Sequence, residues 1–219
     1  MELIGLLALS ILLGLRHGID LDHVAALADI TGGSSGSKKE RMKLSLWYAG
    51  GHEAVVFVLG CSILLFAWTV PIWADHWMGK AVGITLIFMA ILILIGRRNG
   101  SGVYWSRGIA IFQKLRRRND EPFTFTRRNV FTVGVIHGIG AETPTQLLLF
   151  TTVAGAAAAN HGMLAVAAFS IGLLLSHTLI AIVSLWFHDL AKKIRPLLPV
   201  TMYAACLFSF VLGVSYLLE

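Results

Sequence analysis

The chain has 219 residues, of which 56% are hydrophobic and 14% are charged, and its mean hydropathy is +0.75. Soluble domains carry roughly a quarter charged residues, so this balance excludes an ordinary soluble domain and predicts an all-α integral membrane protein. The formal net charge is +6, and membrane orientation accounts for it without a nucleic-acid partner. The two cysteines, Cys61 and Cys206, lie in apolar runs and provide no disulfide framework.

Apolar segments divide the chain into a predicted six-helix membrane domain. A helix that crosses the bilayer needs about 20 residues, and the segments that reach or approach this length cover 3–28, 44–70, 81–96, 129–153, 163–187 and 199–218. All of the 18 lysines and arginines except Arg16 and Lys80 fall in the first, third and fifth loops. Positive-inside sorting therefore predicts a cell-membrane protein with these loops in the cytoplasm and both termini outside.

The first apolar segment contains the most informative residues, which lie between Arg16 and His23. Five ionisable side chains occur there within eight residues, and each costs about 2.5–3.5 kcal/mol at the centre of a bilayer. Imidazole and carboxylate together suit Ni(II) or Co(II) better than Ca or Mg. We therefore predict metal ligands, or alternatively a buried His–Asp network that joins helices, at His17, Asp22 and His23.

Asp20 belongs to the same segment and has two interpretations, as a metal ligand or as the ion-pair partner of Arg16. On an ideal helix Asp20 and His23 fall on the same broad side as His17, whereas Asp22 points elsewhere. A straight helix therefore cannot gather all these groups around one ion. The cluster can act as one site only if the helix is distorted near Gly18.

Further ionisable residues occur inside the second and fifth apolar segments. His52 and Glu53 lie in the second segment and His177 in the fifth. Intramembrane ionisable residues usually face a site or a pathway, so the histidines are interpreted as ligands, relay groups or interhelical hydrogen-bond donors. Glu53 is interpreted as a helix-pairing carboxylate or a proton carrier.

An internal repeat links the first and fourth segments. Residues 14–22 align without gaps with residues 134–142, sharing Gly, His, Gly and Ile and ending in an acid. Residues 51–53 and 176–178 form a weaker echo. A repeated unit of three helices reverses its direction across the membrane, which predicts inverted repeats over 1–96 and 129–219, joined by a basic cytoplasmic loop over 97–128.

The repeat predicts that His137 and Glu142 form the second half of a binding site near the midplane. Pro144 removes a backbone donor and clashes with the preceding turn, so a kink or break is expected there. The polar residues around this proline line the ion path or satisfy freed backbone groups; they are Thr143, Thr145 and Gln146.

With these motifs, the chain resembles the nickel/cobalt transporter family. Residues 16–23 match that family's Arg-His-x-x-Asp-x-Asp-His signature, and Gly51-His52 with Val55-Val56 is similar to its Gly-His and Val-Val motif. Residues 142–146 resemble the Asp-Thr-Ala-Thr-Glu signature, with Pro inserted and the final Glu neutralised. Residues 169–178 resemble a later Phe-x-x-Gly segment that leads to Asp-Thr, with His177 in the Asp position.

The resemblance implies secondary transport of Ni(II) or Co(II), with the ion bound by the first-helix signature. The exchange of Asp for His softens the site, and the loss of an acid lowers its charge. Uptake is the preferred direction, and the alternatives are export by the same fold and delivery of metal to a maturing metalloenzyme. The sequence has no Walker A loop and no His-Glu-x-x-His motif, so we expect no enzyme and no cofactor, only the ion as substrate and the bilayer as partner.

Overall fold

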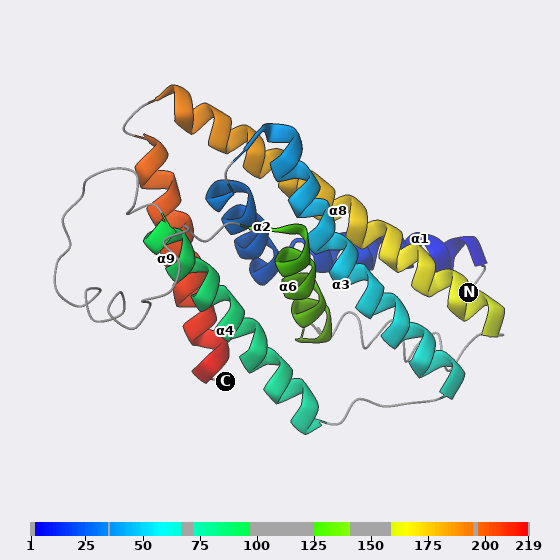
Figure 1. The fold of residues 1–219 in the computed structure, drawn as a ribbon. Coiled ribbons are helices and arrows are strands. Elements are labelled where there is room, and N and C mark those ends of the chain that lie inside the picture. The colour runs from blue at the N-terminus through cyan, green and yellow to red at the C-terminus, as the bar shows by residue number, and fades with distance from the viewer. Residues whose placement is uncertain are drawn as a thin grey trace.

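The computed structural model describes residues 3–34, 36–66, 72–96, 125–140, 159–194 and 197–218, and every regular element in these ranges is an α-helix (Figure 1). The all-α prediction is therefore confirmed for the described residues. The helices in chain order are α1 (Leu3–Gly18), α2 (Leu21–Gly33), α3 (Lys38–Phe66), α4 (Ile72–Gly96), α6 (Arg127–Gly140), α8 (Ala159–Lys193) and α9 (Leu197–Leu218).

Four described helices are long and apolar enough to cross a membrane: Lys38–Phe66, His76–Leu94, His161–Lys193 and Leu197–Leu218. The pair α1 and α2 makes a fifth candidate if the two count as one bent span. The predicted span 129–153 is described only as far as Gly140, as α6. Exposed apolar side chains such as Leu175 and Trp186 cover the outer surface, as lipid contact requires.

Several helices extend beyond their predicted apolar cores because polar capping residues prolong them. The first turn of α3 contains a reciprocal cap: the Ser37 backbone N–H donates to Glu40 Oε2 at 2.7 Å, and the Glu40 N–H donates to Ser37 Oγ at 3.3 Å. Thr126 and Asn129 form an equivalent pair at the start of α6. Such caps satisfy backbone donors that have no partner within the helix, so hydropathy alone underestimates helix length.

The first predicted span is broken where its signature residues lie. Helix α1 ends at Gly18, α2 begins at Leu21, and the two axes differ by 59°. Asp20 has an extended backbone at the N-cap of α2, and its carbonyl accepts the N–H groups of His23 and Val24, both at 3.1 Å. The distortion near Gly18 that a single site requires is thus present, whereas the break expected at Pro144 lies outside the described residues.

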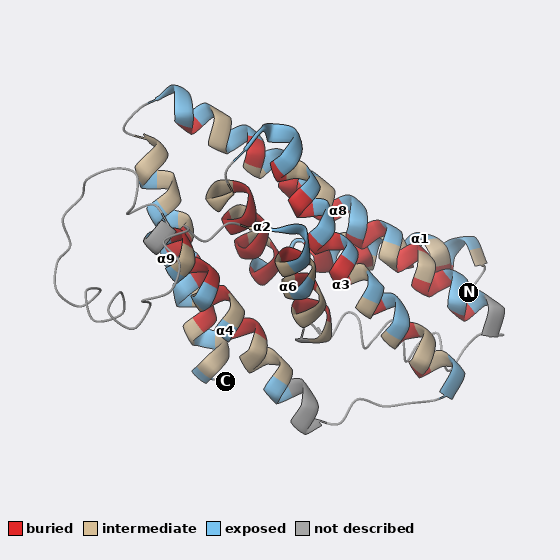
Figure 2. Ribbon diagram, in the orientation of Figure 1, coloured by how far each residue is buried: buried red, intermediate tan, exposed pale blue. Residues whose placement is uncertain are grey.

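The remaining helices pack as three close pairs, with α1 beside α8, α3 beside α6, and α4 beside α9, while the short α2 lies among α3, α4, α8 and α9 (Figure 1). Residues of α2 are mostly buried (Figure 2). Small residues permit the close approach of the paired helices. A Cβ added to either Gly83 or Gly213 would come within 2.7 Å of the other's carbonyl oxygen.

The glycines of the other two pairs follow a common pattern. In α1 and α8, Gly14 abuts the Phe169 carbonyl and Gly172 abuts the Ile11 carbonyl. In α6 and α3, the corresponding contacts are Gly134 with the Tyr48 carbonyl and Gly51 with the Phe131 carbonyl. Each helix of a pair therefore presents at least one glycine to the backbone of its neighbour.

A buried arginine joins three helices at one end of the bundle. Arg41 in α3 is 2% exposed and donates to the Thr31 carbonyl at the end of α2 and to Asp189 in α8, both at 3.0 Å. Lys38 also pairs with Asp189 at 3.3 Å. These contacts bring the start of α3, the end of α2 and the end of α8 together.

Candidate metal centre

The break between α1 and α2 brings the signature histidines together. His17 occupies the last turn of α1 and His23 the first turn of α2, and both are fully buried. Their ring centroids are 5.0 Å apart in an edge-on arrangement. Asp22 is 3% exposed, and its Oδ1 lies 3.1 Å from His23 Nδ1. The break therefore gathers onto one centre residues that a straight helix would separate.

Asp20 contacts both Arg16 and His17. Its Oδ1 forms an ion pair with Arg16, and its Oδ2 lies 3.2 Å from His17 Nδ1. Arg16 remains largely exposed, with 62% of its side-chain surface accessible. In this arrangement Asp20 orients His17 and neutralises Arg16, so the ion-pair interpretation describes the observed contacts.

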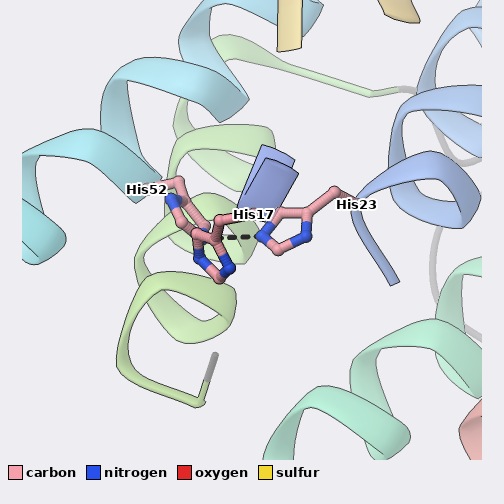
Figure 3. Close-up of side chains that lie close together, drawn as sticks. All are labelled: His17, His23 and His52. Atoms are coloured by element: carbon pink, nitrogen blue, oxygen red, sulfur yellow. Dashed lines mark hydrogen bonds between the residues drawn. The ribbon is translucent and has the colours of Figure 1, made fainter. Parts of the chain in front are cut away.

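Helix α3 contributes His52, which is also fully buried. His52 Nε2 lies 2.8 Å from His23 Nε2. Figure 3 shows His17, His23 and His52 gathered around a common point, each from a different helix. Nitrogen atoms of the three rings lie within 4.8 Å of one another. Metal–nitrogen bonds of about 2 Å require donor atoms only about 3–4 Å apart, so small side-chain movements suffice to close this group around an ion.

A second group of potential ligands shares His52. Helix α3 supplies Glu53 and α8 supplies His177, and ligand atoms of His52, Glu53 and His177 also lie within 4.8 Å of one another. His177 Nδ1 is 2.9 Å from Glu53 Oε1. The His177 ring centroid lies 5.1 Å from that of His52 and 4.9 Å from that of His23. Four buried histidines thus form one continuous cluster.

His137 lies beside this cluster in a different hydrogen-bond chain. It is fully buried, and its Nε2 is 2.7 Å from Thr85 Oγ1 while its Nδ1 is 3.0 Å from the Tyr48 hydroxyl. Because the Thr85 hydroxyl donates to the Val82 carbonyl at 2.8 Å, it accepts from His137 Nε2–H. His137 Nδ1 then accepts from Tyr48, which defines a neutral tautomer.

Tyr48 and Thr85 have no place in the sequence prediction, although Tyr48 occupies the position one turn before His52 on α3. The Tyr48 ring centroid is 5.6 Å from that of His137 and 5.8 Å from that of His177. Tyr48 therefore lies between His137 and the four-histidine cluster. The remaining predicted residues lie outside the described residues; they are Glu142, Thr143, Thr145 and Gln146.

Several polar atoms of the cluster are buried without a hydrogen-bond partner among the described residues. They include His52 Nδ1, His177 Nε2 and Glu53 Oε2. An unsatisfied buried polar atom costs about 1–3 kcal/mol. Imidazole nitrogen and carboxylate oxygen are also the donors that borderline divalent cations prefer. The arrangement therefore has the chemistry of a metal-binding centre.

The cluster of potential metal ligands thus lies at a break between two helices that together could form one membrane span. Comparison with known families agrees: the family described as "High-affinity nickel-transport protein" (NicO) matches residues 3–129. The chain belongs to this nickel/cobalt transporter family.

Curated relatives match over most of the chain. The "Nickel transporter NixA" of Staphylococcus aureus is 28% identical over 180 residues, 70% of this chain and 52% of the relative. The "Cobalt transport protein NhlF" of Rhodococcus rhodochrous is 26% identical over 183 residues, 73% of this chain and 51% of the relative. The chain thus spans about half the length of these transporters.

A shorter relative matches more completely. The "Urease accessory protein UreH" of Bacillus sp. strain TB-90 is 24% identical over 204 residues, 89% of this chain and 82% of the relative. No solved structure matches the chain.

Proposed function

We propose that this protein is a secondary membrane transporter of a divalent transition-metal ion, Ni(II) or Co(II), with uptake as the preferred direction. The observation that carries the proposal is the convergence of His17, His23 and His52 at the break between α1 and α2. Three imidazoles with the carboxylate of Asp22 nearby supply a mixed nitrogen and oxygen set, which suits these metals. The ion is the substrate of the protein rather than a cofactor.

The roles of the other predicted residues follow from their contacts. Asp20 positions His17 and balances Arg16, and Tyr48 and Thr85 hold His137 in one tautomer next to the cluster. Such outer hydrogen bonds orient ligands and tune a metal site. Glu142 and the residues around Pro144 remain proposed pathway residues on the basis of the sequence repeat.

We also propose that residues 1–96 and 129–219 form two inverted three-helix repeats, joined by the loop 97–128. The glycine contacts between paired helices support this. The contact of Gly14 with α8 corresponds to the contact of Gly134 with α3, and the contact of Gly172 with α1 corresponds to that of Gly51 with α6. This correspondence pairs Gly51 with Gly172. The alignment of α3 with α8 by these contacts is therefore shifted by one helical turn from the sequence echo, which aligns residues 51–53 with residues 176–178.

The contacts of Arg41 support the proposed orientation in the membrane. Lys38 and Arg41 of the first loop region meet Asp189, which precedes Lys192 and Lys193 of the fifth loop region. The basic residues of these two regions therefore lie at one end of the bundle. Positive-inside sorting assigns that end to the cytoplasm of the cell membrane, with both termini of the chain on the opposite side.

Reconstituted vesicles test the proposed function. We expect proteoliposomes that contain the full chain to accumulate Ni(II) or Co(II) faster than protein-free liposomes, and to discriminate against Mg(II) and Ca(II) in a panel of divalent ions. Imposed gradients of either sign separate uptake from export. Absence of flux for every transition metal in sealed vesicles would contradict the proposal.

A second candidate function is delivery of metal to a maturing metalloenzyme without transport. The extensive match to a protein named as a urease accessory protein favours this candidate. It predicts binding of Ni(II) by the detergent-solubilised protein together with no flux in vesicles. Flux that exceeds the protein-free control would exclude a purely accessory role.

A further inference from the structure

We propose that His52, Glu53 and His177 form a second binding station for the transported ion, which overlaps the first station at His52. This inference rests on the proposed transport of a divalent transition metal. The first station consists of His17, Asp22 and His23 with His52. Potential ligand atoms of His17, His23 and His52 lie within 4.8 Å of one another, and so do those of His52, Glu53 and His177.

His52 is suited to serve both stations because it belongs to both groups of potential ligands. Its Nε2 lies 2.8 Å from His23 Nε2, whereas its Nδ1 is buried without a hydrogen-bond partner among the described residues. His52 and Glu53 are adjacent on α3, and His177 approaches them from α8. An ion that leaves His17 and Asp22 can therefore stay next to the His52 ring while it gains new ligands.

The contact between Glu53 and His177 Nδ1 leaves His177 Nε2 available as a metal ligand. The carboxylate Oε1 lies 2.9 Å from His177 Nδ1, which favours the proton on that nitrogen and leaves the lone pair on Nε2. This Nε2 atom is buried and has no hydrogen-bond partner in the described part of the chain. A carboxylate that orients an imidazole in this way is a common outer partner in metal sites. Glu53 Oε2 is likewise buried and unpaired.

We expect a single ion to use the two stations alternately, because both stations include His52. The His23 and His177 ring centroids are 4.9 Å apart, and two divalent charges held close together in a buried site would repel each other. One ion therefore occupies alternative positions. Transport benefits because conduction requires several weaker positions from which an ion can leave, whereas one site with all the ligands would release it slowly.

Cobalt binding to the purified full chain tests this proposal directly. Co(II) is the probe, because its absorption spectrum changes with the number and type of ligands. His17→Ala removes a ligand of the first station only. We expect this variant to retain a single bound Co(II) with about tenfold to hundredfold weaker affinity. Adding His177→Ala or Glu53→Gln to His17→Ala is expected to abolish the residual spectrum.

Glu53→Gln preserves side-chain size and therefore provides the test if His177→Ala does not fold. His161 is an exposed histidine, so His161→Ala provides a matched control. Residual Co(II) binding that is insensitive to His177→Ala and Glu53→Gln would overturn the second station, as would the loss of all binding in His17→Ala. In vesicles, His177→Ala alone should lower flux by about tenfold or more while binding persists.

Failure of the second station is distinguishable from failure of transport. Wild-type vesicles that move Ni(II) or Co(II), combined with no second-station spectrum, would overturn only the proposed second station. Wild-type vesicles that move neither metal would contradict the proposed function. The spectrum of His17→Ala would still decide in that case whether the second group binds an ion.

Discussion

His23 Nε2 and His52 Nε2 lie 2.8 Å apart, although 29 positions separate the two residues in the sequence. At this distance one nitrogen donates a proton to the other, so the two rings share one hydrogen between them. A metal ion that binds both nitrogens must displace this proton. The proton can move to the other ring nitrogen of the donor histidine, so metal binding is linked to a change of tautomer at the centre of the site.

The first prediction concerns pH. Because imidazoles must be neutral to bind a metal, the affinity for Ni(II) should fall once the pH is low enough to protonate the ligand histidines. The decrease approaches about tenfold per pH unit for each imidazole that must lose a proton. Ni(II) titrations of the purified protein at several pH values measure this slope. An affinity that stays constant down to the lowest pH at which the protein remains folded would contradict imidazole ligation.

The second prediction concerns the signature histidines. Substitution of either residue, as His17→Ala or His23→Ala, should lower metal affinity and flux by about tenfold to hundredfold. His161→Ala provides the matched control, since His161 is an exposed histidine at the start of α8. Accumulation of Ni(II) and Co(II) at the wild-type rate in vesicles with either signature variant would exclude the assigned site.

The third prediction compares two adjacent glycines of α3. A Cβ at Gly51 would collide with the Phe131 carbonyl of α6, whereas a Cβ at Gly50 would have open space around it. Gly51→Ala should therefore separate α3 from α6 and destabilise the protein by about 1–3 kcal/mol. Gly50→Ala should be neutral, or stabilising by about 0.5–1 kcal/mol.

Thermal unfolding in one detergent compares the two glycine variants under identical conditions. Because His52 directly follows Gly51, we also expect Gly51→Ala to weaken Co(II) binding, while Gly50→Ala should retain it. Equal melting temperatures for the two variants would show that close approach of α3 and α6 does not support the fold.

The fourth prediction concerns the hydrogen-bond chain of His137. Tyr48→Phe keeps the ring but removes the hydroxyl 3.0 Å from His137 Nδ1, and Thr85→Val removes the partner of Nε2. Each leaves a buried nitrogen unpaired, at a cost of about 1–3 kcal/mol. Thr132→Val is the control, because its exposed hydroxyl bonds only to its own helix in the described contacts. Thermal unfolding and flux that match wild type in Tyr48→Phe and Thr85→Val would contradict a positioning role.

Much of the architecture is predictable from the sequence because the determining interactions are local. Hydropathy identifies the apolar core of each described long helix, and the polar run from Arg16 to His23 marks where a break is needed for a single site, which the structure shows between α1 and α2. The full length of α3 is less predictable, since its start depends on the cap between Ser37 and Glu40 rather than on hydropathy.

Only part of the candidate site can be predicted from local sequence. The first-helix signature identifies His17, Asp22 and His23 because their cost in a membrane is evident from the sequence. By contrast, the pairing of Glu53 with His177 joins residues 124 positions apart. The contact of Tyr48 with His137 likewise spans 89 positions, and no local pattern predicts it.

The sequence by itself therefore determines the class of protein, the helical segments, the family and the metal-binding signature, because each depends on residue type and short-range spacing. Only the tertiary structure decides that His52 joins His17 and His23, and that His177 extends the cluster. The physical reason is that helix rotation and depth set which side chains meet. Both are fixed by backbone contacts between distant helices, such as those of Gly51 with Phe131 and of Gly14 with Phe169.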